Sequence, residues 1–485
     1  MIEQASSFAR LFRGSRELEY ATFKKSGRLK LGAKGARVPI ESADYLLEGD
    51  DARLEVRVDC GITTPQAPQN TGSQDVIVFD PGRFYRGIGH FVRLAQGQRL
   101  FLDTRDEEVL SLFPEFSKGP RRKVEVYHDG KSLVFRESAP EAQTYLSLQN
   151  QDERKAEFDV RRIEALDLFT EILGGPPECL SADSAMQQLV EVQALLDNEP
   201  RRLADKNGAP GAVVKLRRKQ TVVVAGDLHG NVDNLLTLLS WSGLAQSLMN
   251  NEAVLVILGD AVHPDSGPDL GDMDESVLMM DLVFCLKLRF PSNVYYLLGN
   301  HDSFSSEVTK LGVPQGLLWS KRLVELRGDA YRERLANIYA SLPLIVYSPV
   351  FCACHAGPPQ GKLDMEMMLN ARQFPHLVHE LTWTRQRVPG RPEGYTKKHA
   401  RRFRKALGLS KKTPFIVGHY PRDENGCIWQ DTGGIDGHHV VYSSNRAAIG
   451  AFVQYGERML PQVVRGEPLT QWLIQRTKGK VVAGS

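Results

Sequence analysis

From Thr221 onward, five short apolar runs are each followed by residue types that bind metals or transfer protons. The runs are TVVVA, AVLVIL, NVYYLL, VFCAC and PFIV, and they are followed by GDLHGN, GDAVHPD, GNHD, HAG and GHYP. Short apolar runs bounded by turn residues are typical of buried strands. In α/β folds, ligand residues gather at the carboxyl ends of strands. The series therefore predicts an α/β fold with one functional site at such an edge.

The preceding part of the chain has a different pattern. Short alternating or apolar runs such as Arg53–Asp59 and Val76–Phe79 predict strands, and an Asp129-Gly130 turn between two such runs predicts a hairpin. Residues 63–74 predict an exposed loop. We therefore expect a β-rich accessory domain of unknown role at 1–150. A second domain is expected at 151–485, with its motif core at 221–456.

Amphipathic patterns predict helices before the first motif and between the strands. One begins near Phe158 and stops at the Gly-Gly-Pro-Pro turn from Gly174, and the next has Ser181 as a candidate cap. Residues 208–211, which contain two glycines and a proline, predict a loop. His438-His439 is expected in a surface loop, with substrate contact as the alternative. Residues 397–405, which are mostly basic, are either a solvated helix face or a surface that attracts a phosphorylated substrate.

Charge and cysteine content exclude several classes of protein. The 485 residues contain 61 Lys and Arg against 59 Asp and Glu, a formal charge of +2, so bulk charge does not favour nucleic-acid or membrane-surface binding. No apolar run is long enough to span a bilayer. The six cysteines form no CxxC pair, and the alternating Cys352 and Cys354 are expected to be buried as small hydrophobic residues. We expect a cytoplasmic protein without nucleic-acid or membrane partners; its oligomeric state is not indicated.

The donor types in the five motifs indicate metal chemistry. A single Gly-Asp is usually a plain turn, and a lone His355 is usually a core histidine, but the ordered series is improbable by chance. Carboxylate, amide and imidazole donors without thiolate favour Mn, Fe, Zn or Mg. Two such cations about 3.5–4 Å apart need a bridging ligand, and water held between them becomes a nucleophile for in-line attack on phosphorus.

The ordered motifs resemble those of the calcineurin-like metallophosphoesterases, and most closely the phosphoprotein (Ser/Thr) phosphatase branch. LTWTR at Leu381–Arg385 and YSSNRAAIGAFVQY at Tyr442–Tyr455 also resemble segments of that branch, and the likeness spans about 158–459. The resemblance implies a four-layer sandwich of two mixed β-sheets flanked by helices. It implies two divalent metal ions, with Mn favoured over Fe, Zn or Mg. Its implied ligands are Asp227 and His229 for one metal, Asn300, His355 and His419 for the other, and Asp260 as the bridge.

The resemblance also assigns His301 as the general acid, but one motif departs from the branch pattern. The branch has GDxVDRG, whereas this chain has GDAVHPD from Gly259. His263 replaces the aspartate that orients the general acid, and Pro264 replaces a phosphate-binding arginine. We expect Asp265 to take over the orienting role. Arg385 or Arg387 is expected to bind phosphate, because a guanidinium fits two phosphate oxygens.

These residues predict a metal-dependent phosphatase that hydrolyses phosphomonoesters, with a phosphorylated protein favoured over a small phosphoester. The expected mechanism is attack by metal-activated hydroxide, with a histidine general acid. One alternative is a nucleotide or dinucleoside polyphosphate hydrolase, because the phosphate-binding arginine is altered. Another is a metal-holding scaffold with weak turnover, because the orienting aspartate is absent.

Overall fold

The computed structural model describes two compact units, which are treated separately below. The described residues of the N-terminal unit are 21–22, 28–31, 35–40, 43–48, 53–59, 76–79, 91–94, 96–97, 99–102, 124–137 and 144–148. Those of the C-terminal unit are 166–474, except 241–243, 268, 389–391, 423–425, 445–448, 456, 465–468 and 472. The loop predicted at 63–74 lies outside the described residues.

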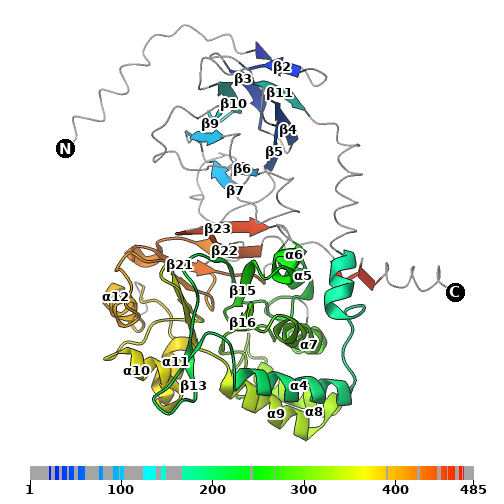
Figure 1. Ribbon diagram of the computed structural model, residues 1–485, viewed down its shortest axis with the longest axis vertical. Helices are drawn as coiled ribbons and strands as arrows, with labels where there is room; N and C mark the ends of the chain where they lie inside the picture. The colour runs from blue at the N-terminus through cyan, green and yellow to red at the C-terminus, as the bar shows by residue number, and fades with distance from the viewer. Residues whose placement is uncertain are drawn as a thin grey trace, which may run out of the picture. The chain divides into compact units, whose positions relative to one another are not determined.

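The N-terminal unit contains two β-sheets, which confirms that this region is β-rich (Figure 1). The first sheet has the order β1 (Ala21–Thr22), β3 (Ala36–Pro39), β10 (Ser132–Glu137), β9 (Val124–His128) and β8 (Arg99–Leu102). The second has the order β2 (Arg28–Lys30), β11 (Tyr145–Leu148), β4 (Ala43–Glu48), β5 (Arg53–Asp59), β6 (Val76–Phe79) and β7 (Phe91–Leu94). The expected hairpin is β9–β10, whose strands pair antiparallel around Asp129-Gly130.

The C-terminal unit is built on two mixed sheets. The sheet named here the β14 sheet has the order β16 (Val294–Tyr296), β15 (Ala253–Ile257), β14 (Thr221–Ala225), β22 (Ile449–Tyr455) and β23 (Arg458–Val464). The β18 sheet has the order β12 (Arg202–Ala204), β13 (Pro210–Lys215), β17 (Ile345–Tyr347), β18 (Cys352–Cys354), β19 (Phe415–Val417), β21 (His438–Val441) and β20 (Ile428–Trp429). Both combine parallel and antiparallel pairs.

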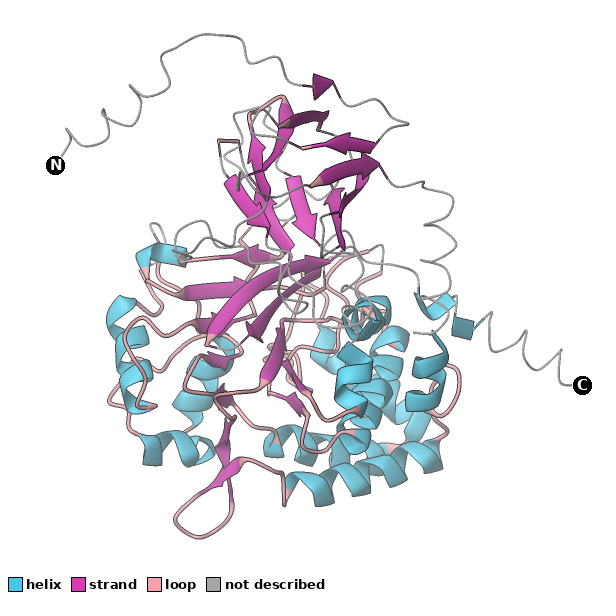
Figure 2. Ribbon diagram, turned by 45° about the horizontal axis from the view of Figure 1, so that its top comes forward, coloured by secondary structure: helices cyan, strands magenta, loops and turns pink. Residues whose placement is uncertain are grey.

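Helices cover the outer face of each sheet (Figures 1 and 2). On the β14 side are α4 (Ala182–Leu196), α5 (Val232–Ser240), α6 (Leu244–Met249), α7 (Asp274–Arg289), α8 (Gln315–Arg327) and α9 (Asp329–Ser341). On the β18 side are α10 (Met365–Leu369), α11 (Pro375–Trp383) and α12 (Lys397–Ala406). Val223 and Ala225 pack with the first helix group, so the alternate residues Val222 and Val224 face the other way and are also buried. This arrangement confirms two mixed sheets flanked by helices.

Two local predictions in this unit are wrong. The loop expected around residues 208–211 ends at Ala209, because β13 begins at Pro210. β13 forms an antiparallel hairpin with β12 and pairs in parallel with β17. Proline is tolerated at the first position of a strand, where its missing N–H need not join the ladder. His438-His439 is not a surface loop but the start of the buried strand β21. By contrast, Ser181 caps α4 as expected, and Cys352 and Cys354 are buried.

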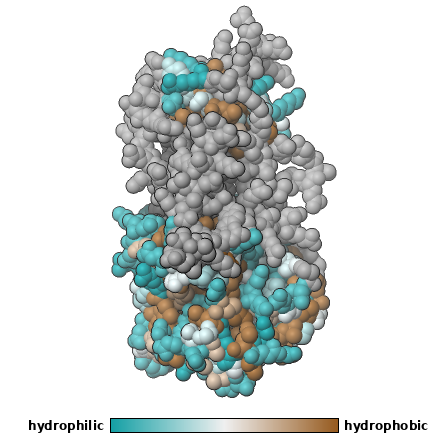
Figure 3. Space-filling model, turned by 90° about the vertical axis from the view of Figure 1, so that its right-hand side faces the viewer, coloured by the Kyte–Doolittle hydropathy of each residue, from teal (hydrophilic) through white to brown (hydrophobic). Residues whose placement is uncertain are grey.

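Buried ion pairs hold the helical layer together. Arg327 of α8 binds Asp281 of α7 through both carboxylate oxygens, at 2.8 and 2.5 Å. Glu199 pairs with Lys287 at 2.5 Å and with Arg202 at 3.3 Å, and all three side chains are almost fully buried. On the face of this unit seen in Figure 3, hydrophobic residues lie among hydrophilic ones. Among the described helices, none is both long enough and apolar enough to cross a bilayer.

Candidate metal centre

The strands of both sheets deliver the candidate ligands to one place. Each ligand stands one or a few residues beyond the carboxyl end of a strand. In the β14 sheet, β14 is followed by Asp227 and His229, β15 by Asp260, and β16 by Asn300; in the β18 sheet, β18 is followed by His355 and β19 by His419. The structure thus brings together all six side chains that the sequence singled out as metal ligands.

Several residues of the candidate metal centre have backbone conformations that are unfavourable for L-amino acids and that the surrounding structure must maintain. Eight described non-glycine residues have positive φ, and four of them are His229, Asp260, His263 and His419. This left-handed region costs an L-residue roughly 1–2 kcal/mol, and such residues cluster at functional sites. Only glycine fits before His419 without a steric clash, because a Cβ on Gly418 would lie 2.2 Å from Oδ1 of Asp227.

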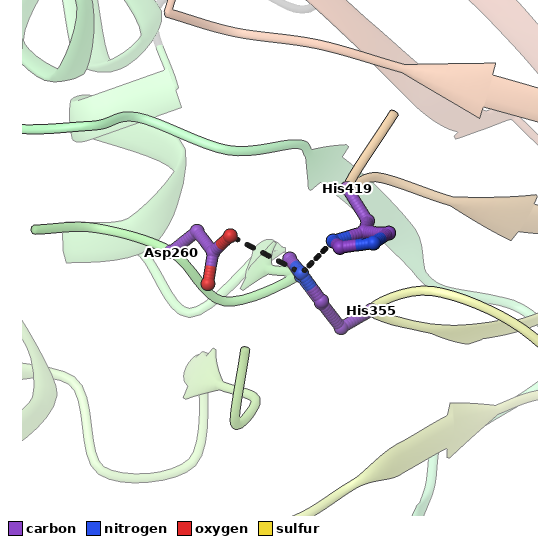
Figure 4. Close-up of side chains that lie close together, drawn as sticks. All are labelled: Asp260, His355 and His419. Carbon is purple, nitrogen blue, oxygen red and sulfur yellow. Dashed lines mark hydrogen bonds and ion pairs between the residues drawn. The ribbon is translucent and has the colours of Figure 1, made fainter. Parts of the chain in front are cut away.

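Two groups of potential ligands share one residue. Asp227, His229 and Asp260 form one group, and Asp260, His355 and His419 form the other, with the ligand atoms of each group within 4.8 Å of one another. Figure 4 shows His355 between Asp260 and His419. Its Nε2 lies 3.2 Å from Oδ2 of Asp260 and 3.2 Å from Nδ1 of His419. Asp260 therefore occupies the position that a bridging ligand requires.

Asn300 completes the second group. Its Oδ1 lies 2.7 Å from Nδ1 of His419 and 3.0 Å from Nε2 of His355. The other nitrogen of His355, Nδ1, donates to the carbonyl of Leu258 at 2.9 Å, so Nε2 is the nitrogen that faces the group and is available to a cation. A carboxylate, an amide oxygen and two imidazoles that converge in this way fit a divalent cation.

His229 is oriented in the same manner. Its Nδ1 donates to the carbonyl of His263 at 2.9 Å, so Nε2 is free to act as a ligand and lies 3.8 Å from Oδ2 of Asp227. The backbone N–H of His419 donates to both oxygens of Asp227 at 2.9 Å. The loop after β19 thus fixes the Asp227 carboxylate that stands after β14.

The electrostatics of the centre also fit cations. Asp227 and Asp260 are 0% and 1% exposed, and within the described part of the chain their ion pairs are with histidines only. Burial raises the pKa of Asp227 to about 6, although His355 opposes this. Burial also acts to raise the pKa of Asp260, but the surrounding histidines hold it well below its ordinary value. Buried negative charge of this kind needs a positive partner.

His301 lies beside the shared carboxylate. Its backbone N–H donates to Oδ1 of Asp260 at 2.7 Å, and its ring meets the ring of His229 edge to face at 5.0 Å. Burial lowers the pKa of His301 to about 4. Its Nδ1 lies 3.0 Å from Nδ1 of His263. His301 is therefore held next to the candidate ligands without being one of them.

The geometry gives Asp265 a different role from the one expected. Its carboxylate accepts hydrogen bonds from the hydroxyls of Tyr442 and Ser444, the second at 3.0 Å, so it joins this loop to the segment after β21. The atom next to Nδ1 of His301 belongs to His263. Hydrogen-bond partners separated by 177 positions are set by tertiary packing, which the local motif did not reveal.

The two candidate phosphate-binding arginines lie in different surroundings. Nε of Arg385 lies 3.3 Å from Nε2 of His419, and its guanidinium stacks over the ring of Tyr420 at 4.4 Å. The backbone N–H of Arg387 donates to the carbonyl of Tyr395 at 3.0 Å, and both arginines are exposed. Only Arg385 of the two has a side-chain contact with a candidate ligand among the described residues.

Sequence reasoning missed a buried carboxylate that supports the site. Asp302 accepts hydrogen bonds from the backbone N–H groups of Gly299 at 2.7 Å and Asp260 at 3.1 Å, and from the hydroxyl of Tyr296. It therefore ties the loop after β15 to the loop after β16. Its position directly after His301 in GNHD was the signal available in the sequence.

Comparison with known proteins identifies the part of the chain that carries these motifs. Residues 220–436 match the family model of the calcineurin-like phosphoesterases. This segment is a calcineurin-like phosphoesterase domain. Its family is metal-dependent, and the phosphoesterase domain of this chain includes all six candidate ligands.

A relative from Schizosaccharomyces pombe, provisionally named as a serine/threonine-protein phosphatase, is 28% identical over 177 residues. The match covers 35% of this chain and 51% of the relative, so the chain spans about half the relative's length. Among solved structures, a serine/threonine phosphatase from Saccharomyces cerevisiae has a TM-score of 0.45 and 17% identity, with 64% of this chain and 96% of that chain covered. A cold-active protein-tyrosine phosphatase from Shewanella has a TM-score of 0.36 and 14% identity, covering 52% and 82%. TM-scores below 0.5 add no argument about this chain.

Proposed function

We propose that the phosphoesterase domain is a dinuclear metal-dependent phosphatase that hydrolyses phosphomonoesters, with phosphorylated protein as its substrate. The observation that carries this proposal is the position of Asp260 in both ligand groups. The donor set favours Mn, with Fe, Zn or Mg as other occupants. When bound, two such cations would activate water and neutralise charge on the phosphoryl oxygens.

The protein's own residues would position the reactants. Asp227, His229 and Asp260 would hold one cation, and Asp260, Asn300, His355 and His419 the other. His301 would donate a proton or hydrogen bond to the departing oxygen through Nε2, because its Nδ1 is engaged by His263. Arg385 would bind phosphoryl oxygens from the His419 side. The phosphatase domain is proposed to span 151–485, with an accessory domain at 1–150 and a cytoplasmic location.

Metal removal tests the proposal. Purified protein treated with EDTA should lose p-nitrophenyl phosphate hydrolysis, and Mn²⁺ should restore it with about two equivalents bound, because the two groups share one carboxylate. Metal analysis and phosphate release are the measurements. Full activity of a preparation without metal would contradict the proposal, and two bound metals without turnover on any substrate would favour the scaffold alternative.

A substrate panel separates the two enzymatic readings. Phosphopeptides should be cleaved with higher kcat/KM than diadenosine tetraphosphate, because the proposed reaction is phosphomonoester hydrolysis and the dinucleotide contains no phosphomonoester. The exposed cations Lys398, Arg401 and Lys405 of α12 would attract an acidic phosphopeptide. Like charges three and four positions apart on a helix are destabilising unless an anion compensates them. Preference for the dinucleotide would support the polyphosphate hydrolase instead.

Charge reversal on α12 tests its contribution to substrate attraction. The Lys398→Glu/Arg401→Glu/Lys405→Glu variant should show a several-fold lower kcat/KM for an acidic phosphopeptide at low salt and unchanged p-nitrophenyl phosphate hydrolysis. The difference should vanish at high salt. Lys321→Glu, an exposed change on α8, is the matched control. A salt-independent loss would exclude electrostatic attraction as the cause.

Arg385 and Arg387 provide a paired test of phosphate binding. Arg385→Ala should lower kcat/KM for p-nitrophenyl phosphate by about 10–100-fold, because a charged hydrogen bond contributes about 1.5–3 kcal/mol. Arg387→Ala should change it by less than about twofold. Steady-state kinetics check both variants. If the double variant retains the wild-type kcat/KM, neither arginine binds the phosphoryl group.

A further inference from the structure

Arg385 is exposed, whereas the residue that follows it is buried and held by several contacts. Gln386 is 5% exposed. Its Nε2 donates to the carbonyl of Thr432 at 3.0 Å, and its Oε1 accepts from Nη2 of Arg422. Gly433 has a φ of 63°, and a Cβ at that position would overlap the amide of Gln386. The loops after β19 and β20 therefore meet at the Gln386 side chain.

A backbone bridge fixes the chain on both sides of Gln386. The N–H of Tyr395 donates to the carbonyl of Arg385 at 3.1 Å, and the N–H of Arg387 donates to the carbonyl of Tyr395 at 3.0 Å. Tyr395 is 2% exposed. The two exposed arginines thus flank a residue whose backbone and side chain are both anchored in the interior.

His438 links these two anchors. The hydroxyl of Tyr395 lies 2.8 Å from Nε2 of His438, and the hydroxyl of Thr432 contacts Nδ1 of the same ring. His438 is completely buried in β21, and its ring lies 5.3 Å from the ring of Phe415 in β19, centroid to centroid. The histidine therefore joins the residue that holds the backbone of Gln386 to the residue that holds its side chain.

These contacts determine where the side chain of Arg385 begins. Its guanidinium stacks over the ring of Tyr420 at 4.4 Å, with Nε 3.3 Å from Nε2 of His419. An exposed arginine has many rotamers, and ordering it costs about 2 kcal/mol. A fixed backbone directs the side chain towards His419, and the Tyr420 ring then favours the rotamers that stack on it. Much of the ordering cost is therefore met when the protein folds rather than when substrate binds.

We propose that Gln386 and His438 are positioning residues, which hold Arg385 where it binds the phosphoryl group of the substrate. Both act through Arg385 and have no contact with the reacting atoms. This inference rests on the proposed phosphatase function. It assigns a role to His438, which lies in a buried strand rather than in the surface loop expected from the sequence.

Substitution of Gln386 tests the inference by kinetics. Gln386→Met keeps the length of the side chain but removes both hydrogen bonds, so kcat/KM for p-nitrophenyl phosphate should fall by about 10-fold while bound metal is unchanged. In Arg385→Ala protein the same change should cost less than about twofold, because the side chain that it positions is already absent. Gln188→Met is the matched control, because it removes the hydrogen bond from a buried glutamine of α4 to the carbonyl of Asp281 and should leave kcat/KM unchanged.

Tyr395→Phe tests the link through His438, because it removes the hydroxyl and keeps the ring. It should lower kcat/KM for p-nitrophenyl phosphate by about 3–10-fold, and again by less than about twofold in Arg385→Ala protein. His438→Gln should retain more activity than His438→Leu, because the amide both donates and accepts hydrogen bonds.

Spectra of the Arg385 side chain give a readout that needs no turnover. The ring of Tyr420 should shift the ¹⁵N–¹H signal of Nε away from the range of exposed arginines, and Arg385→Lys assigns that signal. In Gln386→Met and Tyr395→Phe the signal should move towards that range. The affinity of the Zn²⁺-loaded protein for inorganic phosphate should fall by about 10-fold in Gln386→Met.

Two results would overturn the inference. One is an Arg385 signal that is unchanged in both Gln386→Met and Tyr395→Phe. The other is a loss from Gln386→Met that is as large in Arg385→Ala protein as in the wild type. If the wild type cleaves no phosphoester, the proposed function fails, while the spectra and the affinity for inorganic phosphate still decide whether these residues position Arg385.

Discussion

Replacing Asp260 by asparagine should abolish measurable phosphatase activity, with kcat/KM for p-nitrophenyl phosphate reduced by about 1,000-fold or more. Asp260 belongs to both ligand groups, so the substitution removes one negative charge from each. Asparagine keeps the shape and one oxygen, which isolates the loss of charge from a loss of packing. Bound metal should fall from about two equivalents to one or none. Metal analysis and steady-state kinetics on the same preparation are the measurements.

Asp364→Asn is the matched control for this substitution. Asp364 caps α10 through its side chain, and asparagine caps helices equally well, so activity and metal content should stay at the wild-type level. Thermal unfolding in EDTA should show that Asp260→Asn is folded, because the asparagine oxygen can still accept the hydrogen bond from the backbone N–H of His301. Wild-type activity in Asp260→Asn would rule out the dinuclear proposal.

Arg327→Met should lower the free energy of unfolding by about 3–5 kcal/mol, the largest stability effect expected in the described chain. The substitution leaves Asp281 buried without its cation, since the Arg327 and Asp281 side chains are 2% and 3% exposed. Burial raises the pKa of Asp281. Protonation therefore favours the folded variant, and its deficit should shrink as the pH falls towards that raised pKa. Urea-induced unfolding at several pH values measures both effects.

Arg322→Met supplies the comparison, because Arg322 and Asp274 form a pair of similar length, 2.6 Å, with side chains 35% and 60% exposed. Water already solvates both charges, so the loss should be below about 1 kcal/mol. Arg327→Met/Asp281→Leu should recover part of the stability by removing the unpaired carboxylate. If Arg327→Met and Arg322→Met lower the free energy of unfolding equally, burial does not determine the strength of these ion pairs.

The fold and the positions of the candidate ligands were predictable because their signals are local. An apolar strand followed by Gly and a donor residue is readable within about ten positions, as at Ala253–Asp260. Once two sheets face each other, the ends of β14 and β19 must meet, and Asp227 then lies beside His419. The metal-binding role of these residues remains a proposal.

The surroundings of the site were less predictable, because they depend on contacts between distant segments. Asp265 bonds to Tyr442, far along the chain, rather than to His301. His263 is oriented by a left-handed backbone and by Ser276, neither of which a motif reveals. β13 was not predicted, because its first two residues are proline and glycine, which are typical of turns. The strand is stabilised by pairing with β17, which lies more than a hundred positions further along the chain. Tertiary pairing overrode the local turn signal in that case.

Drawing ligands from both sheets has a consequence for how the domain resists unfolding. Asp227, Asp260 and Asn300 follow strands of the β14 sheet, whereas His355 and His419 follow strands of the β18 sheet. A metal ion bound by residues of both sheets would link the two sheets at the edge where these strands end. Since an unfolded chain lacks this arrangement, the melting temperature should climb with free metal concentration. The supply of metal would then govern the lifetime of the protein as well as its chemistry.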